Sequence, residues 1–473
     1  MTNPPVGMPG SYSTNPLYET RPTASPVPPG AFPPPSRSSI SQPTTSASSS
    51  VPALGSHSDE PTLPYHLNPH QRHPPLYSAN PSPAQMPAYS GGGGVGGGKV
   101  GGGERRHMLR YEAPWPIYGL DWSNRGGEES WRIAIGSLVE EFNNKLQIVQ
   151  LAEEGARYHS DFVPIAEADH GYPLTKVLWE PNKGGARTTD LLATTSDCLR
   201  LWELHTPEDR SSSHKLTLRA RLTNTKADFS APLTSFDWCD ADPSLVVTCS
   251  IDTTCTAWNV ETQQAKTQLI AHDREVYDVA FMTHHANVFA SVGADGSVRL
   301  FDLRSLEHST IIYETPNPPD KPTPLLRLAF NRQEPHHVST FHMDSSSIQI
   351  FDIRVPGVPY AELRGHGASV NCCGWAPHLK NLVVSGGEDA QVLVWDLAVG
   401  GAQPGAETSV GGSSSATGDT GRGGGSGRNT TRLITDPVFA YTAEAEVNQL
   451  NWSKVNTDWM AIVHGKTMQA LKF

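Results

Sequence analysis

One stretch decides the fold of this chain: Val276-Tyr-Asp-Val-Ala-Phe281, then Phe289-Ala-Ser-Val-Gly-Ala-Asp295-Gly, then Ser297-Val-Arg-Leu-Phe301-Asp302. Each segment is short and mostly apolar, and polar residues separate one segment from the next. Short runs of this kind between turn residues predict β-strands. The stretch therefore predicts a small antiparallel sheet whose first strand ends in an aromatic residue.

The same order of segments recurs along the chain. A second clear copy consists of Val370–Trp375, Leu382–Asp389 and Gln391–Asp396. Five further units have a first strand that ends in an aromatic residue, at Trp122, Trp179, Trp238, Phe330 and Trp452. Self-similarity at a period of roughly 40 to 45 residues predicts a β-propeller. Because no single blade buries both of its faces, we expect an all-β ring of seven stacked blades.

The last unit lacks a fourth strand. Its three expected strands, Val447–Trp452, Trp459–Gly465 and Thr467–Phe473, reach the end of the sequence. Residues 107–113 lie just before the first unit and alternate apolar with polar side chains, as an edge strand does. We therefore expect this N-terminal strand to complete the last blade and to close the ring.

Composition separates the ring from two other segments. Residues 1–104 are dominated by Pro, Ser, Gly and Thr and contain no periodic apolar stretch, so a disordered arm is expected. Residues 105–473 are expected to form the propeller. A low-complexity insertion at about residues 400–431 interrupts the sixth unit between its third and fourth strands, where loop length is tolerated. The fourth strand is expected to resume near Val438–Thr442.

Bulk charge and composition exclude several classes of protein. The formal net charge is -12, which argues against direct nucleic-acid binding through an extended basic surface. No run of eighteen apolar residues and no apolar signal core occurs, so neither membrane insertion nor secretion is expected. The six cysteines form no CxxC pair, which fits buried thiols in a reducing compartment, the nucleus and cytoplasm. No His or Cys pattern has zinc spacing, so we expect no metal and no cofactor.

The sixth unit contains a Ser, a His and an Asp that could suggest hydrolysis. His366, Ser385, Asp389 and Trp395 have the spacing of the hydrogen-bond network that staples the strands of WD repeats. We favour this structural interpretation, because the network that these residues resemble in WD repeats joins strands and is not an exposed nucleophile. In the fourth unit Phe301 replaces the indole, so the network there is expected to be incomplete.

Several long matches identify a family resemblance. Ile117–Asn124, Arg132–Val149, His272–Asp278 and Phe351–Pro356 resemble the WD40-repeat adaptor family of the plant transparent-testa-glabra protein and the animal Cullin-4-associated WD-repeat factor. The similarity runs from about Leu109 to Phe473, without the glycine-rich insertion. It implies a non-enzymatic scaffold, without a small-molecule substrate, that assembles DYRK-type and HIPK-type protein kinases or MYB and basic helix-loop-helix transcription factors.

The resemblance also implies a link to Cullin-4 ubiquitin ligases. Some members serve as substrate receptors of these ligases and bind the ligase adaptor through an Asp-x-Arg motif at the end of a WD unit. Asp302 with Arg304, and Asp352 with Arg354, are similar to this motif in consecutive units, with Phe in place of Trp before the Asp. The alternative is that each arginine only pairs with its own aspartate.

The starts of the inner strands bear on catalysis. Propeller enzymes place charged ligands around the axis, whereas the expected inner strands begin with apolar residues, at Ile117, Leu174, Leu233, Val276, Leu325, Val370 and Val447. An apolar axis offers no acid, base or metal cage, so no catalytic residue is expected. The alternative function is a propeller hydrolase or lyase with an axial site, which charged side chains converging on the axis would favour.

Charged residues occupy the connections that lead into the inner strands and one turn. We expect them on one rim, where a partner peptide would bind: Arg274, Glu275, Glu388, Glu444 and Glu446. For each of them the alternative is a solvated loop charge that contributes nothing to binding.

Overall fold

Antiparallel strands make up most of the part of the chain that the structure describes. The computed structural model describes residues 107–140, 143–153, 160–181, 190–207, 213–223, 231–316, 321–399 and 431–473. These residues all belong to one unit, Gly98–Phe473. The predicted arm, residues 1–104, and almost all of the predicted insertion lie outside the described residues.

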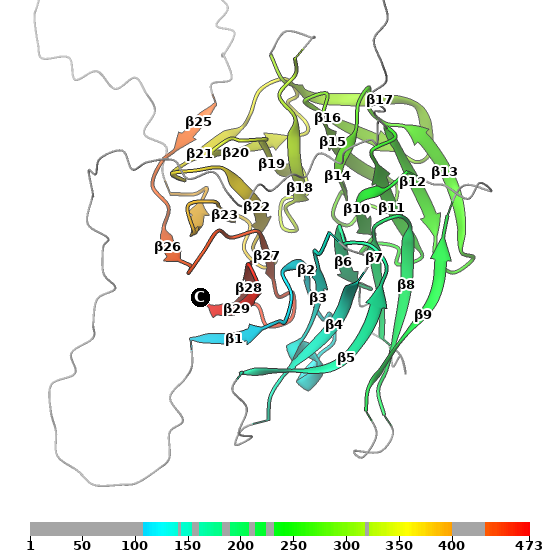
Figure 1. Ribbon diagram of the computed structural model, residues 1–473. Helices are drawn as coiled ribbons and strands as arrows, with labels where there is room; N and C mark the ends of the chain where they lie inside the picture. The colour runs from blue at the N-terminus through cyan, green and yellow to red at the C-terminus, as the bar shows by residue number, and fades with distance from the viewer. Residues whose placement is uncertain are drawn as a thin grey trace, which may run out of the picture. The chain divides into compact units, whose positions relative to one another are not determined.

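The strands form seven sheets that follow one another around a ring (Figure 1). Blade 1 contains β2 (Ile117–Trp122), the 3-10 helix η1 (Gly127–Trp131), β3 (Arg132–Ser137), β4 (Asn144–Leu151) and β5 (Phe162–His170). Blade 2 contains β6 (Lys176–Trp179), β7 (Asp190–Thr195), β8 (Leu199–His205) and β9 (Lys215–Leu222). Blade 3 contains β10 (Leu233–Trp238), β11 (Leu245–Ser250), β12 (Thr254–Asn259) and β13 (Gln264–Ile270). Blade 4 contains β14 (Val276–Phe281), β15 (Val288–Gly293), β16 (Ser297–Asp302) and β17 (Ser305–Glu314).

In blades 1 to 4 the strands of a blade follow one another in the sequence, and the remaining blades depart from this order in two places. Blade 5 contains β18 (Leu325–Phe330), β19 (His337–His342), β20 (Ser347–Asp352) and β21 (Ala361–Arg364). Blade 6 contains β22 (Val370–Trp375), β23 (Leu382–Gly387), β24 (Gln391–Asp396) and β26 (Phe439–Thr442). Blade 7 contains β27 (Gln449–Trp452), β28 (Trp459–His464), β29 (Thr467–Lys472) and β1 (Met108–Glu112). The predicted seven-bladed propeller is thereby confirmed.

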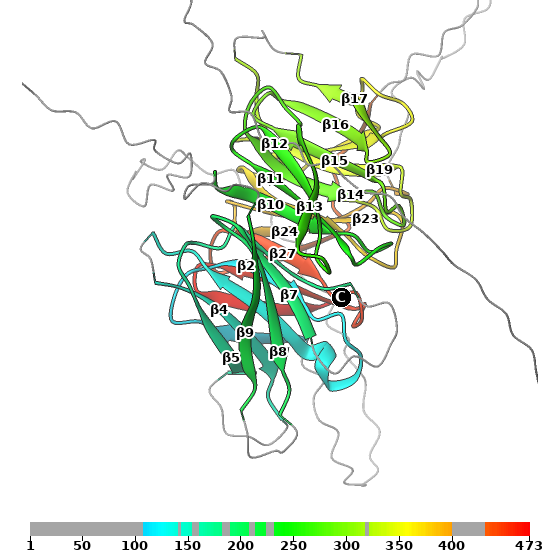
Figure 2. The ribbon, with the colours of Figure 1, turned by 90° about the vertical axis from the view of Figure 1, so that its right-hand side faces the viewer.

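The N-terminal strand closes the ring as predicted. β1 pairs antiparallel with β29 along its whole length, from Met108 opposite Leu471 to Glu112 opposite Thr467. The neighbouring inner strands β27 and β2 then touch, which joins blade 7 to blade 1. In the second view, the outer strands β5 and β9 of the first two blades run next to each other (Figure 2).

Blade 5 contains a fifth strand that the sequence did not predict. β25 (Arg432–Ile434) pairs in parallel with the outer strand β21, and Leu363 lies opposite Ile434. The chain thus leaves β24 of blade 6, adds a strand to blade 5 and returns to blade 6 as β26. A three-residue strand is too short to show a period, so only the pairing with β21 identifies it.

The core lies between the blades. Six of the seven first residues of the expected inner strands are buried in apolar clusters, and Leu233 is partly buried against another, so they pack against neighbouring blades and leave the axis to residues further along each strand. Val276 and Leu325, for example, are both fully buried in such clusters. All six cysteines are unpaired, five of them buried and Cys373 partly so, as predicted. Within the described ranges, no helix has the length and apolarity needed to span a bilayer.

Candidate functional site

Aspartates on the inner strands connect three pairs of neighbouring blades. The backbone N–H groups of Trp179, Phe281 and Leu328 donate to the carboxylates of Asp121, Asp237 and Asp278 at 2.7, 2.8 and 2.8 Å. Each bond crosses from one blade to its neighbour, where the ladder of a single sheet cannot satisfy the N–H group. These carboxylates therefore have a structural role.

The three carboxylates differ in their electrostatic surroundings. Burial raises the pKa of Asp121 to about 6 and also raises the pKa of Asp237. Burial acts in the same direction on Asp278, but the charges of Lys176 and Arg327, with hydrogen bonds to its carboxylate, outweigh it and lower the pKa. Asp278 is thus the carboxylate that stays ionised beside two cations.

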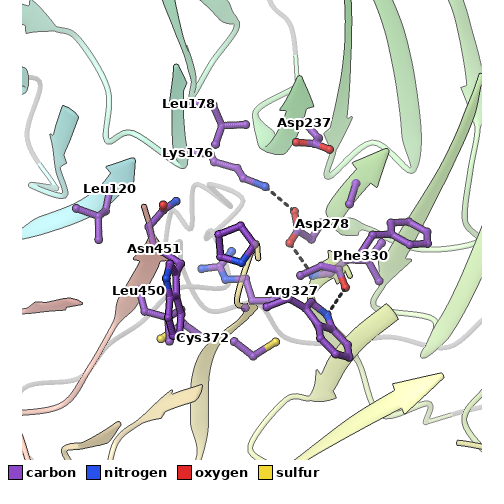
Figure 3. Close-up of a pocket in the computed structure, with 18 of the residues that line it drawn as sticks. Leu120, Lys176, Leu178, Asp237, Asp278, Arg327, Phe330, Cys372, Leu450 and Asn451 are labelled. Carbon is purple, nitrogen blue, oxygen red and sulfur yellow. Dashed lines mark hydrogen bonds and ion pairs between the residues drawn. The ribbon is translucent and has the colours of Figure 1, made fainter. Parts of the chain in front are cut away.

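Charged side chains converge on the axis of the ring, so the predicted apolar axis is wrong. A cavity of about 290 Å³ is lined by inner strands of all seven blades. Lys176 of blade 2 reaches across to Asp278 of blade 4, with 3.3 Å between Nζ and Oδ1, and Arg327 of blade 5 lies beside them (Figure 3). The apolar first residues are buried between blades, and β-bulges in β14 and β18 turn Asp278 and Arg327 toward the axis, whereas Lys176 reaches it from β6 without a bulge.

This convergence is the observation that would favour an axial enzyme, but the contacts of its carboxylates favour a structural role. Asp278 accepts from Ser235 Oγ at 2.5 Å and from the backbone of Val279 and Leu328, and pairs with Lys176. A carboxylate bound in this way is poorly placed to take a proton from a substrate. Among the described residues, no group of three or more His, Cys, Asp or Glu could hold a metal ion.

The predicted network in blade 6 is present in the structure. Trp395 Nε1 donates to Ser385 Oγ at 2.9 Å, Ser385 lies 2.7 Å from His366 Nε2, and His366 Nδ1 lies 3.0 Å from Asp389 Oδ1. The carboxylate of Asp389 also accepts the backbone N–H of Gly367 at 2.8 Å. Ser385 is fully buried, so the arrangement joins strands and presents no nucleophile.

Blade 4 has the incomplete version that the sequence predicts. His272 lies 2.9 Å from Asp295 and 2.7 Å from Ser291, and Phe301 occupies the place of the indole. Arg299 Nη2 lies 3.0 Å from Asp295 and adds a charge that blade 6 lacks. Burial alone would raise the pKa of Asp295. The hydrogen bonds and charge of His272 and the hydrogen bonds from Ser297 outweigh it and hold this pKa well below the ordinary value.

Sequence reasoning missed a third version in blade 2. Trp202 Nε1 donates to Thr194 Oγ1 at 2.9 Å, and Thr194 lies 3.1 Å from His170 Nε2. Nδ1 of His170 faces the backbone oxygen of Tyr172 in place of an aspartate, and burial lowers the histidine's pKa to about 4. A threonine in the position of the network serine, followed by a tryptophan, is the signal that could have revealed it.

The two Asp-x-Arg motifs lie on the bottom face, which we define as the connections that leave the inner strands together with the ends of the third strands. Nε and Nη2 of Arg304 lie 2.9 and 2.5 Å from the two oxygens of Asp302. Arg354 binds Asp352 in the same way, at 2.9 and 2.7 Å. The local pairing is therefore present, and the side chains of Arg304 and Arg354 are still 69% and 59% exposed.

These pairs fix the charge state of the aspartates and the direction in which the arginines point. The hydrogen bonds from Arg304 lower the pKa of Asp302 to about 2, and those from Arg354 lower the pKa of Asp352. Both aspartates thus stay ionised at neutral pH, and each holds its guanidinium as a planar fork at the surface.

Three of the five predicted rim residues come together on the top face, which comprises the connections into the inner strands and the turns between second and third strands. Glu388, Glu444 and Glu446 are all exposed. The backbone N–H of Val447 donates to the oxygen of Gly387 at 3.0 Å, which places Glu446 beside the turn that carries Glu388. We call these three residues the acidic cluster; it lies where blade 6 meets blade 7.

The other two predicted residues lie elsewhere on the top face. Arg274 is exposed and Glu275 half-buried, both on the connection into blade 4. The backbone oxygen of Glu275 accepts the N–H of Ala294 at 2.8 Å, so this residue also shapes the connection. Glu444 of the acidic cluster pairs with Arg110 of the closing strand at 2.5 Å, a contact that the sequence could not reveal.

Comparisons with known proteins add an independent finding. The WD domain, G-beta repeat, matches residues 263–302 and 357–396, and each match runs from an outer strand through the third strand of the next blade. The chain is similar to the DDB1- and CUL4-associated factor 7 homolog of Dictyostelium discoideum, with 45% identity over 78% of this chain and 99% of that relative.

Two fungal proteins match a similar share of this chain. An uncharacterized WD repeat-containing protein of Schizosaccharomyces pombe is 43% identical over 76% of this chain and 89% of its own length. A WD repeat-containing protein of Saccharomyces cerevisiae is 36% identical over 77% of this chain and 76% of its own length. The likeness therefore spans most of the propeller and extends far beyond the two matched repeats.

Proposed function

Because the chain belongs to the WD-repeat family that includes the DDB1- and CUL4-associated factor 7 homolog, we propose that it is a non-enzymatic adaptor of protein complexes. A closed ring with two faces offers separate surfaces to two partners at once. The bottom face carries the Asp–Arg pairs and the top face carries the acidic cluster, so each face has its own chemistry for recognition.

The observation that carries the ligase part of the proposal is the pair of exposed guanidinium groups on consecutive blades. Arg304 and Arg354 stand at the ends of β16 and β20, and each is fixed by its own ionised aspartate. Pre-oriented arginines lose little side-chain entropy on binding, and arginine is enriched among residues that dominate interface energies. We propose that they bind DDB1, so that the chain serves a CUL4 ligase as its substrate receptor.

The client part of the proposal rests on the acidic cluster. Glu388 and Glu446 are exposed side by side, and Glu444 next to them already pairs with Arg110. The negative charge of the cluster favours a partner segment rich in Lys or Arg, because complementary charge speeds encounter and selects the partner. Protein kinases of the DYRK type and transcription factors, which the family resemblance suggests, are the clients to test first.

A binding measurement tests the ligase part. Purified full-length protein and purified DDB1 are brought together, and the dissociation constant is measured for the native chain and for the double variant Arg304→Ala, Arg354→Ala. We expect the double variant to bind at least tenfold more weakly, with an unchanged melting temperature. Both arginine side chains are mostly exposed, so the fold does not need them.

Arg364→Ala is the matched control. Arg364 pairs with Glu362 at 2.9 Å through both nitrogens and is 59% exposed, but it lies within β21 and not at the end of a third strand. This variant should bind DDB1 as the native chain does. Equal loss in the control and the double variant, or no loss in either, would contradict the role of the Asp-x-Arg pairs.

A further inference from the structure

Arg327 has an unusual backbone conformation for its place in the fold. Its φ is +48°, although it lies inside the inner strand β18. The other non-glycine residues with positive φ in the described ranges all lie in turns: Thr253, Gln263, His284, Asp344 and Ala390. Positive φ is unfavourable for a residue with a long side chain, and such strain gathers where the surrounding structure uses the side chain.

The strained residue points its charge into the axial cavity. The pairing of β18 with β19 shifts between Leu326 and Ala329, and this bulge turns Arg327 toward the axis (Figure 3). There its guanidinium lies 5.6 Å from the ring centroid of Tyr118 in blade 1 and donates to the hydroxyl of that tyrosine. The side chain thus crosses the axis from blade 5 to blade 1.

The cavity as a whole has an excess of positive charge. Its lining contains Lys176, Arg327, Arg332 and Lys454, against Asp237, Asp240 and Asp278. Arg332 pairs with Asp240 at 3.4 Å, and Lys176 pairs with Asp278 at 3.3 Å. Arg327 also acts on Asp278, and Lys176 and Lys454 act on Asp237. The four cations and three carboxylates together give the lining a formal charge of one positive unit.

The cavity is reached from the bottom face. Its lining continues from Lys176 and Arg327 to Pro181, Thr283 and Lys454, which follow the ends of inner strands. A volume of about 290 Å³ is close to that of small-ligand pockets. It lies at the opposite end of the inner strands from the acidic cluster, whose negative charge would repel an anion.

We propose that this axial cavity binds a small phosphate-bearing molecule, which Arg327 contacts through its guanidinium and Lys176 through its ammonium group. Arginine presents planar donors that match phosphate oxygens, and lysine adds a point charge. Three observations support this site: the side chains of Lys176 and Arg327 are held in place by their contacts, they line a cavity, and the backbone of Arg327 is strained. The proposal does not depend on the adaptor role.

Calorimetric titration of the full chain with inorganic phosphate and with glycerol phosphate tests the site, in chloride buffer of constant ionic strength. We expect saturable one-to-one binding that is at least tenfold weaker in Arg327→Gly and in Lys176→Gln. Glycine accepts a φ of +48° without strain, so Arg327→Gly should fold even if loss of the Lys176–Asp278 pair disturbs the other variant.

Two controls decide the outcome. Arg274→Gln removes an exposed cation of the top face and should bind phosphate as the native chain does. Acetate tests whether any oxyanion suffices. The proposal is overturned by equal phosphate binding in the native chain and Arg327→Gly, by absence of saturable binding, or by acetate binding as tight as phosphate binding.

Discussion

The closing strand β1 is the feature whose energetic role can be predicted most directly. Leu109 and Tyr111 are 7% and 5% exposed and belong to the apolar cluster that blades 7 and 1 share. Tyr111 also donates to Gln147 of blade 1 at 2.6 Å, so the strand holds both ends of the ring. Met108, on the opposite side of the strand, is 47% exposed.

Leu109→Ala should therefore lower the free energy of unfolding by about 3 kcal/mol, within the range for a leucine truncated in a core. Met108→Ala, in the same strand and with the same pairing to β29, should change it by about 0.5 kcal/mol or less. With a urea slope of about 3 kcal/mol per M, the first variant should lower the urea midpoint by about 1 M. Deletion of residues 107–113 should lower the melting temperature sharply.

Urea unfolding followed by tryptophan fluorescence measures these changes, with the slope checked for each variant. Trp122 and Trp459 belong to the same cluster as Leu109, so part of the signal comes from the affected region. Equal small effects of Leu109→Ala and Met108→Ala, together with a deletion variant that melts as the native chain does, would refute closure by β1.

Three further predictions follow from the geometry. Asp389→Ala should cost about 1 to 3 kcal/mol of stability, because it leaves Nδ1 of the buried His366 without its carboxylate partner, whereas the exposed Glu388→Ala should leave the melting temperature unchanged. Charge reversal of Glu388 and Glu446 together should weaken client binding in a pull-down without loss of stability; unchanged capture would remove the acidic cluster from the interface. The pKa of Asp121 is raised to about 6 by burial, so its native form takes up a proton that the unfolded chain, near 3.8, does not. Stability relative to Asp121→Asn should thus rise by about 1 kcal/mol from pH 7 to pH 5, and a flat or falling difference in denaturation curves would contradict this sign.

The positions of the network in blade 6 could be predicted because each partner occupies a fixed place in the repeat. His366 precedes the inner strand, Ser385 lies in the second strand and Trp395 in the third. Antiparallel pairing brings these places together in every blade, whatever the rest of the chain does. The blade 2 version was missed because Thr194 replaces the serine and the backbone oxygen of Tyr172 replaces the aspartate.

The charged side chains that line the axis could not be predicted from the sequences of the inner strands. A β-bulge shifts which side chains face inward, and the residues that cause it lie on the paired strand as well as on the strand itself. Lys176 and Asp278 come from blades 2 and 4, and nothing local to either residue indicates the other. The apolar starts of the strands therefore misled the interpretation of the axis.

By itself, the sequence determined the number of blades, the closing strand and the strand order within each blade, because these depend on local alternation and on a period that repeats. The tertiary structure decided the contacts between distant units: the pairing of β25 with β21, the contact of Glu444 with Arg110 and the convergence of Lys176, Asp278 and Arg327 on the axis. Such contacts depend on how seven twisted sheets are placed around a ring, and no short stretch of sequence encodes that placement.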